Sequence, residues 1–221
     1  IGFDDPATFV EELENTLSDN DKAMFESYKN TRSKLEDLFD ISLSEHFLSW
    51  MSGEFALSQS EPGLLGYEPE LILAVRAKSI KDAHEKMDFI EKKIKKRTPV
   101  KVKTTDYKSF EIKYVEMKGF FRLFFGGMFD KFEKPYYTYI DDYVVFSNKS
   151  SSLLSFIEDY EQKNLLKNNP GFKNAYSYFH SNSTAFVYTD VHKFYPQLRS
   201  MVNPATWKDL QANRDVVYAF P

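Results

Sequence analysis

Cysteine is absent from this chain of 221 residues. Its absence excludes disulfides, thiolate catalysis, and zinc or iron–sulfur sites that depend on cysteine. Glycine occurs only 8 times, and its positions fit neither a phosphate-binding loop nor a nucleophile elbow. The sequence therefore disfavours nucleotide-dependent chemistry and lowers the expectation of an enzyme without excluding one.

Histidine is scarce as well, and its four positions are scattered along the chain: His46, His84, His180 and His192. None of them lies one helical turn from another, which is the spacing that would place two ligands on one metal ion. We predict no metal site and no cofactor, and we interpret each histidine as an ordinary surface or rim residue.

Charge of one sign does not dominate the chain, whose formal net charge is -4. Such a charge provides no global field that would attract nucleic acid or anionic lipid. Between residues 92 and 103 seven lysines and arginines gather, five of them near a predicted helix C-terminus, where cations complement the helix dipole. We interpret this run as a solvated face and predict no nucleic-acid partner, with contact to nucleic acid or acidic headgroups as the alternative.

Apolar and aromatic residues are abundant: 42% of the residues are hydrophobic and 17% are aromatic, including 21 Phe and 14 Tyr. A disordered chain would be poor in such residues. The length and composition suffice for a sizeable core.

A pattern of strand, polar capping turn and amphipathic helix recurs along the chain. In the clearest copy, a strand at 71–75 precedes Ser79, which begins a helix with a capping-box-like turn and an apolar stripe that runs to about Arg97. The predicted strands of the four copies lie at residues 1–3, 71–75, 143–146 and 185–188, and the helices at 7–17, 79–97, 153–157 and 194–201.

Further elements fall between these units: helices at 21–39 and 42–50, and strands at 54–57, 110–115 and 136–140. The strands at 136–140 and 143–146 predict a hairpin across Asp141 and Asp142, and we interpret this acidic pair as turn residues rather than catalytic carboxylates. Helices that fall between hairpins favour an α+β fold with a mixed, mainly antiparallel sheet and helices packed on one face. We predict a single domain over residues 1–221, with 119–135 as the seam if it comprises two similar lobes.

The predicted elements imply a set of buried residues on their apolar faces. These are Leu73, Val75, Ile90, Ile112, Val145, Phe156, Phe186 and Tyr188.

Both ends of the chain have the pattern of a strand, at residues 1–3 and 215–221. Because strands rarely begin or end a native chain so abruptly, we expect that a further segment precedes Ile1. That segment could hold a signal or a membrane anchor, and we expect membrane association only through it.

Three short motifs carry a resemblance to a known family: residues 53–57, residues 142–147 with the helix that follows, and residues 168–172 leading to 184–188. Over residues 35–192 the chain resembles an uncharacterised bacterial family, a domain of unknown function from large cell-envelope proteins. The resemblance implies a periplasmic or surface-exposed location and an N-terminal anchor or lipoprotein signal. It implies no catalytic residues.

The segment at residues 120–132 is unusually aromatic. Its apolar positions cover about half of a helix circumference, while Arg122 lies on the opposite side. We interpret it either as a helix that closes the core or joins two lobes, or as a contact surface for a partner or an apolar ligand that uses Phe121, Phe125, Phe129 and Arg122.

These observations favour a non-enzymatic cell-envelope domain that binds a protein partner or an apolar ligand through this aromatic segment. One alternative is a hydrolase or transferase whose site is dispersed in the sequence. The other is a structural spacer in a longer envelope protein. Exposure of the Phe side chains would favour the binding domain, and a pocket with convergent polar groups would favour the enzyme.

Overall fold

The structure, a computed structural model, describes residues 5, 6, 8, 11, 12, 22–60, 70–99, 101–118, 121, 132–178 and 185–219. It divides into two compact units, each described by itself below. The first comprises Ile1–Gln59 and Glu70–Ser155, and the second comprises Ser60–Pro69 and Phe156–Pro221. Compactness alone does not show independent folding, so the expectation of one domain stays a prediction, and most of the predicted seam at 119–135 lies outside the described residues.

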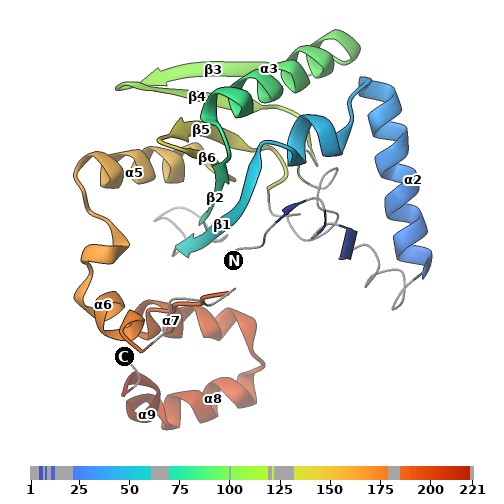
Figure 1. The fold of residues 1–221 in the computed structure, drawn as a ribbon. Helices are drawn as coiled ribbons and strands as arrows, with labels where there is room; N and C mark the ends of the chain where they lie inside the picture. The colour runs from blue at the N-terminus through green and yellow to red at the C-terminus, as the bar shows by residue number, and fades with distance from the viewer. Residues whose placement is uncertain are drawn as a thin grey trace. The chain divides into compact units, whose positions relative to one another are not determined.

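In the first unit, helix α2 (Lys22–Phe39) confirms the helix predicted at 21–39 (Figure 1). The helix predicted at 42–50 is a short π-helical turn, η1 (Ser44–Leu48). Around this turn Phe39, Phe47 and Trp50 are almost completely buried. The end of α2 and the turn η1 therefore contribute Phe39 and Phe47 to the main core.

A six-stranded sheet follows, in the order β1-β2-β6-β5-β4-β3. The pairs β2–β6, β6–β5, β5–β4 and β4–β3 are all antiparallel. The strands are β1 (Met51–Ser60), β2 (Glu70–Ala77), β3 (Val102–Tyr107), β4 (Phe110–Val115), β5 (Tyr136–Ile140) and β6 (Tyr143–Ser147). Sheet and helices together confirm the predicted α+β class, and β3 is a strand that the sequence pattern did not predict.

The predicted hairpin joins β5 to β6, with Ile140 paired to Tyr143. Its turn places Asp141 at a φ of 49°, in the left-handed region that aspartate tolerates better than most residues. This geometry supports the interpretation of Asp141 as a turn residue.

Helix α3 (Ile80–Arg97) lies beside the sheet and follows its predicted course. Ser79 caps it, because its side-chain oxygen accepts a hydrogen bond from the backbone N–H of Asp82 at 3.3 Å. The predicted apolar stripe is buried: Ala83, Met87, Ile90 and Ile94. It belongs to the same core as alternate residues of β2, such as Leu73 and Val75, and this continuity anchors the helix on one face of the sheet.

Helix α5 (Ser150–Glu161) follows β6 in the chain, as the strand–turn–helix pattern predicted. Its first turn is tied to β2, since Ser152 donates a hydrogen bond to the carboxylate of Glu70 at 2.6 Å. Asn148, just before the helix, accepts a hydrogen bond from the backbone N–H of Leu71 at 2.9 Å. These contacts hold the start of α5 against β2.

The second unit is helical in its regular parts. Its elements are η3 (Leu166–Asn168), α6 (Pro170–Tyr176), α7 (Val191–Met201), α8 (Pro204–Ala212) and α9 (Arg214–Tyr218). Tyr195 on α7 holds the last three helices together, with ring centroids 5.3 Å from Trp207 and 5.0 Å from Tyr218. Its hydroxyl group also donates a hydrogen bond to the carbonyl oxygen of Leu210 at 3.1 Å.

Two strand predictions in this unit are wrong. Residues 185–188 adopt no regular structure, and residues 215–218 of the C-terminal segment predicted as a strand are helical in α9. A strand needs a neighbouring strand for its backbone hydrogen bonds, and the described residues of this unit contain none. The β-branched and aromatic residues were therefore a weak guide, because tertiary contacts override their preference for strands.

Of the eight residues predicted to be buried, five are buried and Phe156, Phe186 and Tyr188 are only partly buried. The strand predicted at 1–3 lies outside the described residues. Within the described part of the chain, none of the helices combines the length and apolar character that crossing a membrane requires.

Candidate functional site

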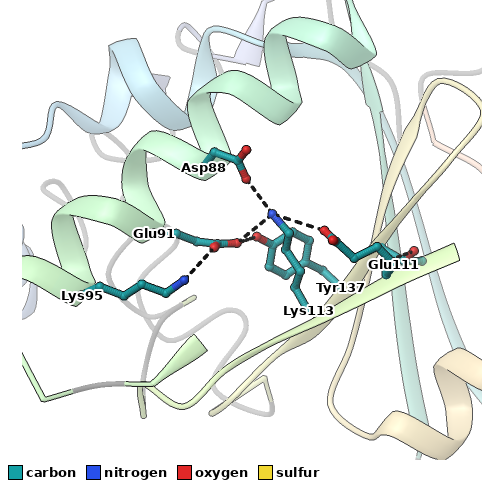
Figure 2. A network of polar contacts seen from close by, with 7 residues as sticks. Asp88, Glu91, Lys95, Glu111, Lys113 and Tyr137 are labelled. Carbon is teal, nitrogen blue, oxygen red and sulfur yellow. Dashed lines mark hydrogen bonds and ion pairs between the residues drawn. The ribbon is translucent and has the colours of Figure 1, made fainter. Parts of the chain in front are cut away.

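A cluster of ionisable side chains joins α3 to β4 in the first unit, and Figure 2 shows it at close range. The ammonium group of Lys113 on β4 lies 2.6 Å from Oδ1 of Asp88 and 3.3 Å from Oε1 of Glu91, both on α3. It also lies 3.5 Å from Oε1 of Glu111. Asp88 and Glu91 share a helix face because they are three residues apart, and Glu111 and Lys113 share a strand face because they are two apart.

Glu91 occupies the closed end of this cluster. Only 10% of its side chain is exposed, and only 9% of the Lys113 side chain. Its carboxylate accepts a hydrogen bond from the hydroxyl group of Tyr137 and lies 3.6 Å from the ammonium group of Lys95. The buried carboxylate is thus surrounded by donors, as a buried charge must be.

The electrostatics of the cluster keep Lys113 and Tyr137 protonated. Burial by itself would lower the pKa of Lys113, but its hydrogen bond to Asp88 and the nearby charge of Glu91 raise that pKa above its usual value. Burial raises the pKa of Tyr137 well above its usual value, and the carboxylate of Glu91 adds to the effect. A general base or nucleophile must be able to release its proton near neutral pH, which neither group does. We therefore interpret the cluster as a structural tie between helix and sheet.

His84 lies at the edge of the same cluster. Its ring stacks on that of Tyr139, with centroids 3.4 Å apart. Burial lowers the pKa of His84, and the positive charge of Lys113 lowers it further, although Asp88 and Glu111 act in the opposite direction. His84 is therefore neutral at pH 7.

The other two described histidines belong to different units. His46 stacks on Phe89, and its Nδ1 accepts a hydrogen bond from the backbone N–H of Ser42 at 2.9 Å. His192 packs against Tyr218 in the second unit. Among the residues that the structure describes, no three histidine, aspartate or glutamate side chains gather so that they could hold a metal ion.

The predicted contact residue Phe121 is completely buried in the first unit. Its ring packs edge-on against Phe146, with centroids 4.8 Å apart, and also contacts Phe47 and Phe132. Phe132, at the other end of the predicted segment, is also buried. Both positions fit the alternative in which this segment closes the core. Arg122, Phe125 and Phe129 lie outside the described residues, and their contact role stays a prediction.

A different group of aromatic rings is partly exposed in the second unit. We call it the aromatic surface and define it by Phe172, Tyr176, Phe186 and Tyr188. Phe172 lies at its centre, with ring centroids 5.5 Å from Tyr176, 5.8 Å from Phe186 and 5.2 Å from Tyr188. Tyr176 is 53% exposed, and Val187 and Tyr178 beside these residues in the sequence are exposed as well.

Local sequence builds this surface. Asn169 caps α6, because its side-chain oxygen accepts a hydrogen bond from the backbone N–H of Phe172 at 3.0 Å, and Pro170 begins the helix. Tyr176 follows Phe172 by four residues and so lies on the same helix face. A methyl group on Gly171 would lie 3.5 Å from the hydroxyl group of Tyr188, so the extended segment approaches α6 closely at this point.

The sequence contained a signal for this surface. The spacing of Phe172 and Tyr176 is helical and that of Phe186 and Tyr188 is alternating, both of which are patterns of apolar faces. Pattern alone predicts burial, however, and the prediction for Phe186 and Tyr188 was burial in a core. Among the described residues of this unit, only Ile157 and Tyr195 are buried hydrophobic residues, so these rings remain partly exposed.

Comparison with known proteins places the chain in a family. None of the curated proteins and none of the solved structures with which the chain was compared matches it. One family model matches residues 64–220, more than half of the chain, and it is described as a protein of unknown function (DUF3352). This match agrees with the resemblance to an uncharacterised family that the sequence motifs indicated. The chain therefore belongs to the DUF3352 family of proteins of unknown function.

Proposed function

We propose that this chain is a non-enzymatic binding module of the bacterial cell envelope, which contacts a protein partner or an apolar ligand through aromatic side chains. The observation that carries the proposal is the aromatic surface of the second unit. Four rings pack on one another there while Tyr176 remains half exposed. Aromatic side chains provide large contact areas at a low cost in conformational entropy, and tyrosine is enriched at protein interfaces.

The state of the ionisable cluster also supports binding rather than catalysis. Lys113 and Tyr137 are held in their protonated forms, and Glu91 is saturated with donors. An active site would instead combine perturbed groups with a cavity that admits substrate. The envelope location in this proposal rests on the resemblance of the sequence motifs.

Site-specific photocrosslinking in bacteria that produce the complete native protein would test the proposal. Benzoylphenylalanine in place of Tyr176 should crosslink to a discrete partner, and the same group in place of Leu57, which is 60% exposed on β1, serves as the control. Subcellular fractionation of the same cells tests the location. A discrete product at position 176 but not at position 57, in the envelope fraction, would support the proposal.

Two variants separate the alternatives. Replacing Tyr176 and Tyr188 with serine should abolish the crosslinked product and the binding of an apolar fluorescent probe. Because the rings are partly exposed, the melting temperature should change little, by the equivalent of roughly 0.5–1.5 kcal/mol. A wild-type protein that neither crosslinks nor binds the probe would instead favour a spacer. Loss of a measured turnover in a variant of the ionisable cluster around Lys113 would favour an enzyme.

A further inference from the structure

Strand β3 forms one edge of the sheet in the first unit. It pairs with β4 on one side, and the strand order ends with it on the other. Its four middle residues, 103–106, are all exposed. An exposed edge presents a row of backbone donors and acceptors that another strand can bind.

The ladder shows which backbone groups point outward. The backbone N–H of Glu116 donates to the carbonyl oxygen of Lys101 at 3.1 Å, whereas that of Val115 donates to Pro135 on the side of β5. Hydrogen-bonded and non-hydrogen-bonded pairs alternate in an antiparallel ladder. The backbone groups of Lys101 therefore point toward β4. Those of Val102, Thr104 and Asp106, which alternate with them along β3, point toward the open edge.

Lysines gather at one end of this edge. Lys101, Lys103 and Lys134 line a shallow depression of about 470 Å³ together with Pro99 and Glu116. Lys103 lies 3.7 Å from Glu116, an exposed pair of a kind that contributes little to stability. Neither Lys101 nor Lys134 has an ion-pair partner among the described residues. With three lysines and one glutamate, the lining of the depression has an excess of positive charge.

The charge is distributed unevenly along β3. The lysines lie near its start, whereas Asp106 lies near its end. A bound strand would thus be favoured if its acidic residues faced the start of β3. A second copy of β3 in parallel register would place lysine beside lysine, and like charges in contact are unfavourable.

We propose that the open edge of β3 binds an extended acidic segment of a protein partner by strand addition. The backbone groups of Val102, Thr104 and Asp106 pair with the segment, and Lys101, Lys103 and Lys134 bind its carboxylates in the depression. Backbone pairing provides affinity in this mode of recognition, and side chains provide specificity. This site is independent of the aromatic surface, because it lies on other residues of the other unit.

Fluorescence anisotropy with the whole chain and a labelled ten-residue peptide of alternating glutamate and valine would test the proposal. We expect saturable binding that weakens about tenfold when Lys101, Lys103 and Lys134 are replaced with glutamine, and that weakens with added salt. The matched control replaces Lys81, Lys167 and Lys208, which are exposed lysines elsewhere, and should leave binding unchanged.

Three further peptides and one variant separate the contribution of charge from that of strand pairing. A peptide with glutamine in place of glutamate, and one with alternate backbone nitrogens methylated, should each bind at least about tenfold more weakly. Thr104→Pro should have the same effect, since the N–H that it removes points away from β4. Equal binding of the methylated peptide would overturn strand addition, as would equal binding of a third peptide with the same glutamates and valines in scrambled order.

Lack of binding by the wild-type protein would also overturn the proposal, and the lysines would then serve only to prevent edge-to-edge aggregation. A dimer in light scattering that Thr104→Pro dissociates would show that a second copy occupies the edge, which contradicts the proposal too. Crosslinking at position 176 tests the aromatic surface separately, so the failure of one proposal is distinguishable from the failure of the other.

Discussion

Replacing Lys113 with methionine should destabilise the first unit strongly. The substitution keeps most of the side-chain volume but removes the ammonium group that lies within 4 Å of three carboxylates. Asp88 and Glu111 are 44% and 49% exposed and can regain water, so losing the ammonium group costs these two carboxylates little stability. Glu91 is only 10% exposed and would remain a buried charge with fewer partners.

The expected magnitude follows from this burial. Breaking a buried ion pair by removing one partner typically costs about 3–5 kcal/mol. We expect about 3 kcal/mol, the lower end, because Tyr137 and Lys95 still face the carboxylate of Glu91. With an m value of about 2 kcal/mol per molar urea, the unfolding midpoint should fall by about 1.5 M.

Tryptophan fluorescence can follow this unfolding selectively. The chain has two tryptophans, Trp50 in the first unit and Trp207 in the second. In a Trp207→Phe background, the emission of the buried Trp50 reports the first unit alone. Lys81→Met is the control, because the Lys81 side chain is 85% exposed and should contribute less than about 1 kcal/mol.

A second substitution tests the cause of the loss. Adding Glu91→Gln to Lys113→Met removes the unpaired charge and retains an oxygen that accepts the hydrogen bond of Tyr137. The double variant should recover most of the lost stability, since replacing both members of a buried pair is often nearly neutral. A loss below about 1 kcal/mol in Lys113→Met, or no recovery in the double variant, would refute this account of the cluster.

Three further predictions concern the first unit, and one concerns the whole chain. Phe121→Ala should cost about 3–5 kcal/mol in urea unfolding, because the ring is completely buried; a loss under about 1 kcal/mol would contradict its place in the core. The lowered pKa of His84 means that the unfolded chain binds the proton more readily, so the free energy of unfolding should fall as pH decreases through about 6.5. His84→Gln should make this dependence on pH less steep than in wild type, and equal dependence in both would be inconsistent with the buried stack. Asp141→Gly should leave the melting temperature within a few degrees of wild type, whereas Asp141→Val should lower it, because valine tolerates a φ of 49° poorly. A lower melting temperature for the glycine variant than for the valine variant would exclude the turn interpretation. A chelator should leave the melting temperature unchanged, and a drop of several degrees would reveal a metal site.

Local patterns were sufficient to predict much of the secondary structure. The cap at Ser79 and the stripe from Ala83 to Ile94 lie within one helix, and the hairpin across Asp141 involves neighbouring strands. Interactions between residues close in sequence decide such elements, so periodicity and capping residues identify them. For the same reason the strand–helix units around α3 and α5 were confirmed.

Which apolar face is covered, and by what, was decided only by the tertiary structure. Phe121 joins the core through Phe47 and Phe146, which are distant in sequence, and the aromatic surface stays partly exposed although its spacing is that of a buried face. Lys113 was part of a predicted strand, yet its burial depends on the carboxylates of Asp88 and Glu91, which α3 supplies from 25 and 22 residues away.

The two incorrect strands have the same physical origin. Residues 185–188 and the segment after Asn213 have the composition of strands, but a strand becomes stable only when a neighbour pairs with its backbone. The described part of the second unit offers no such neighbour, so α9 satisfies its hydrogen bonds internally and Phe186 and Tyr188 pack on α6. Composition and periodicity determined which residues could be apolar contacts, whereas the availability of a partner strand or helix, which only the tertiary structure contains, determined what they contact.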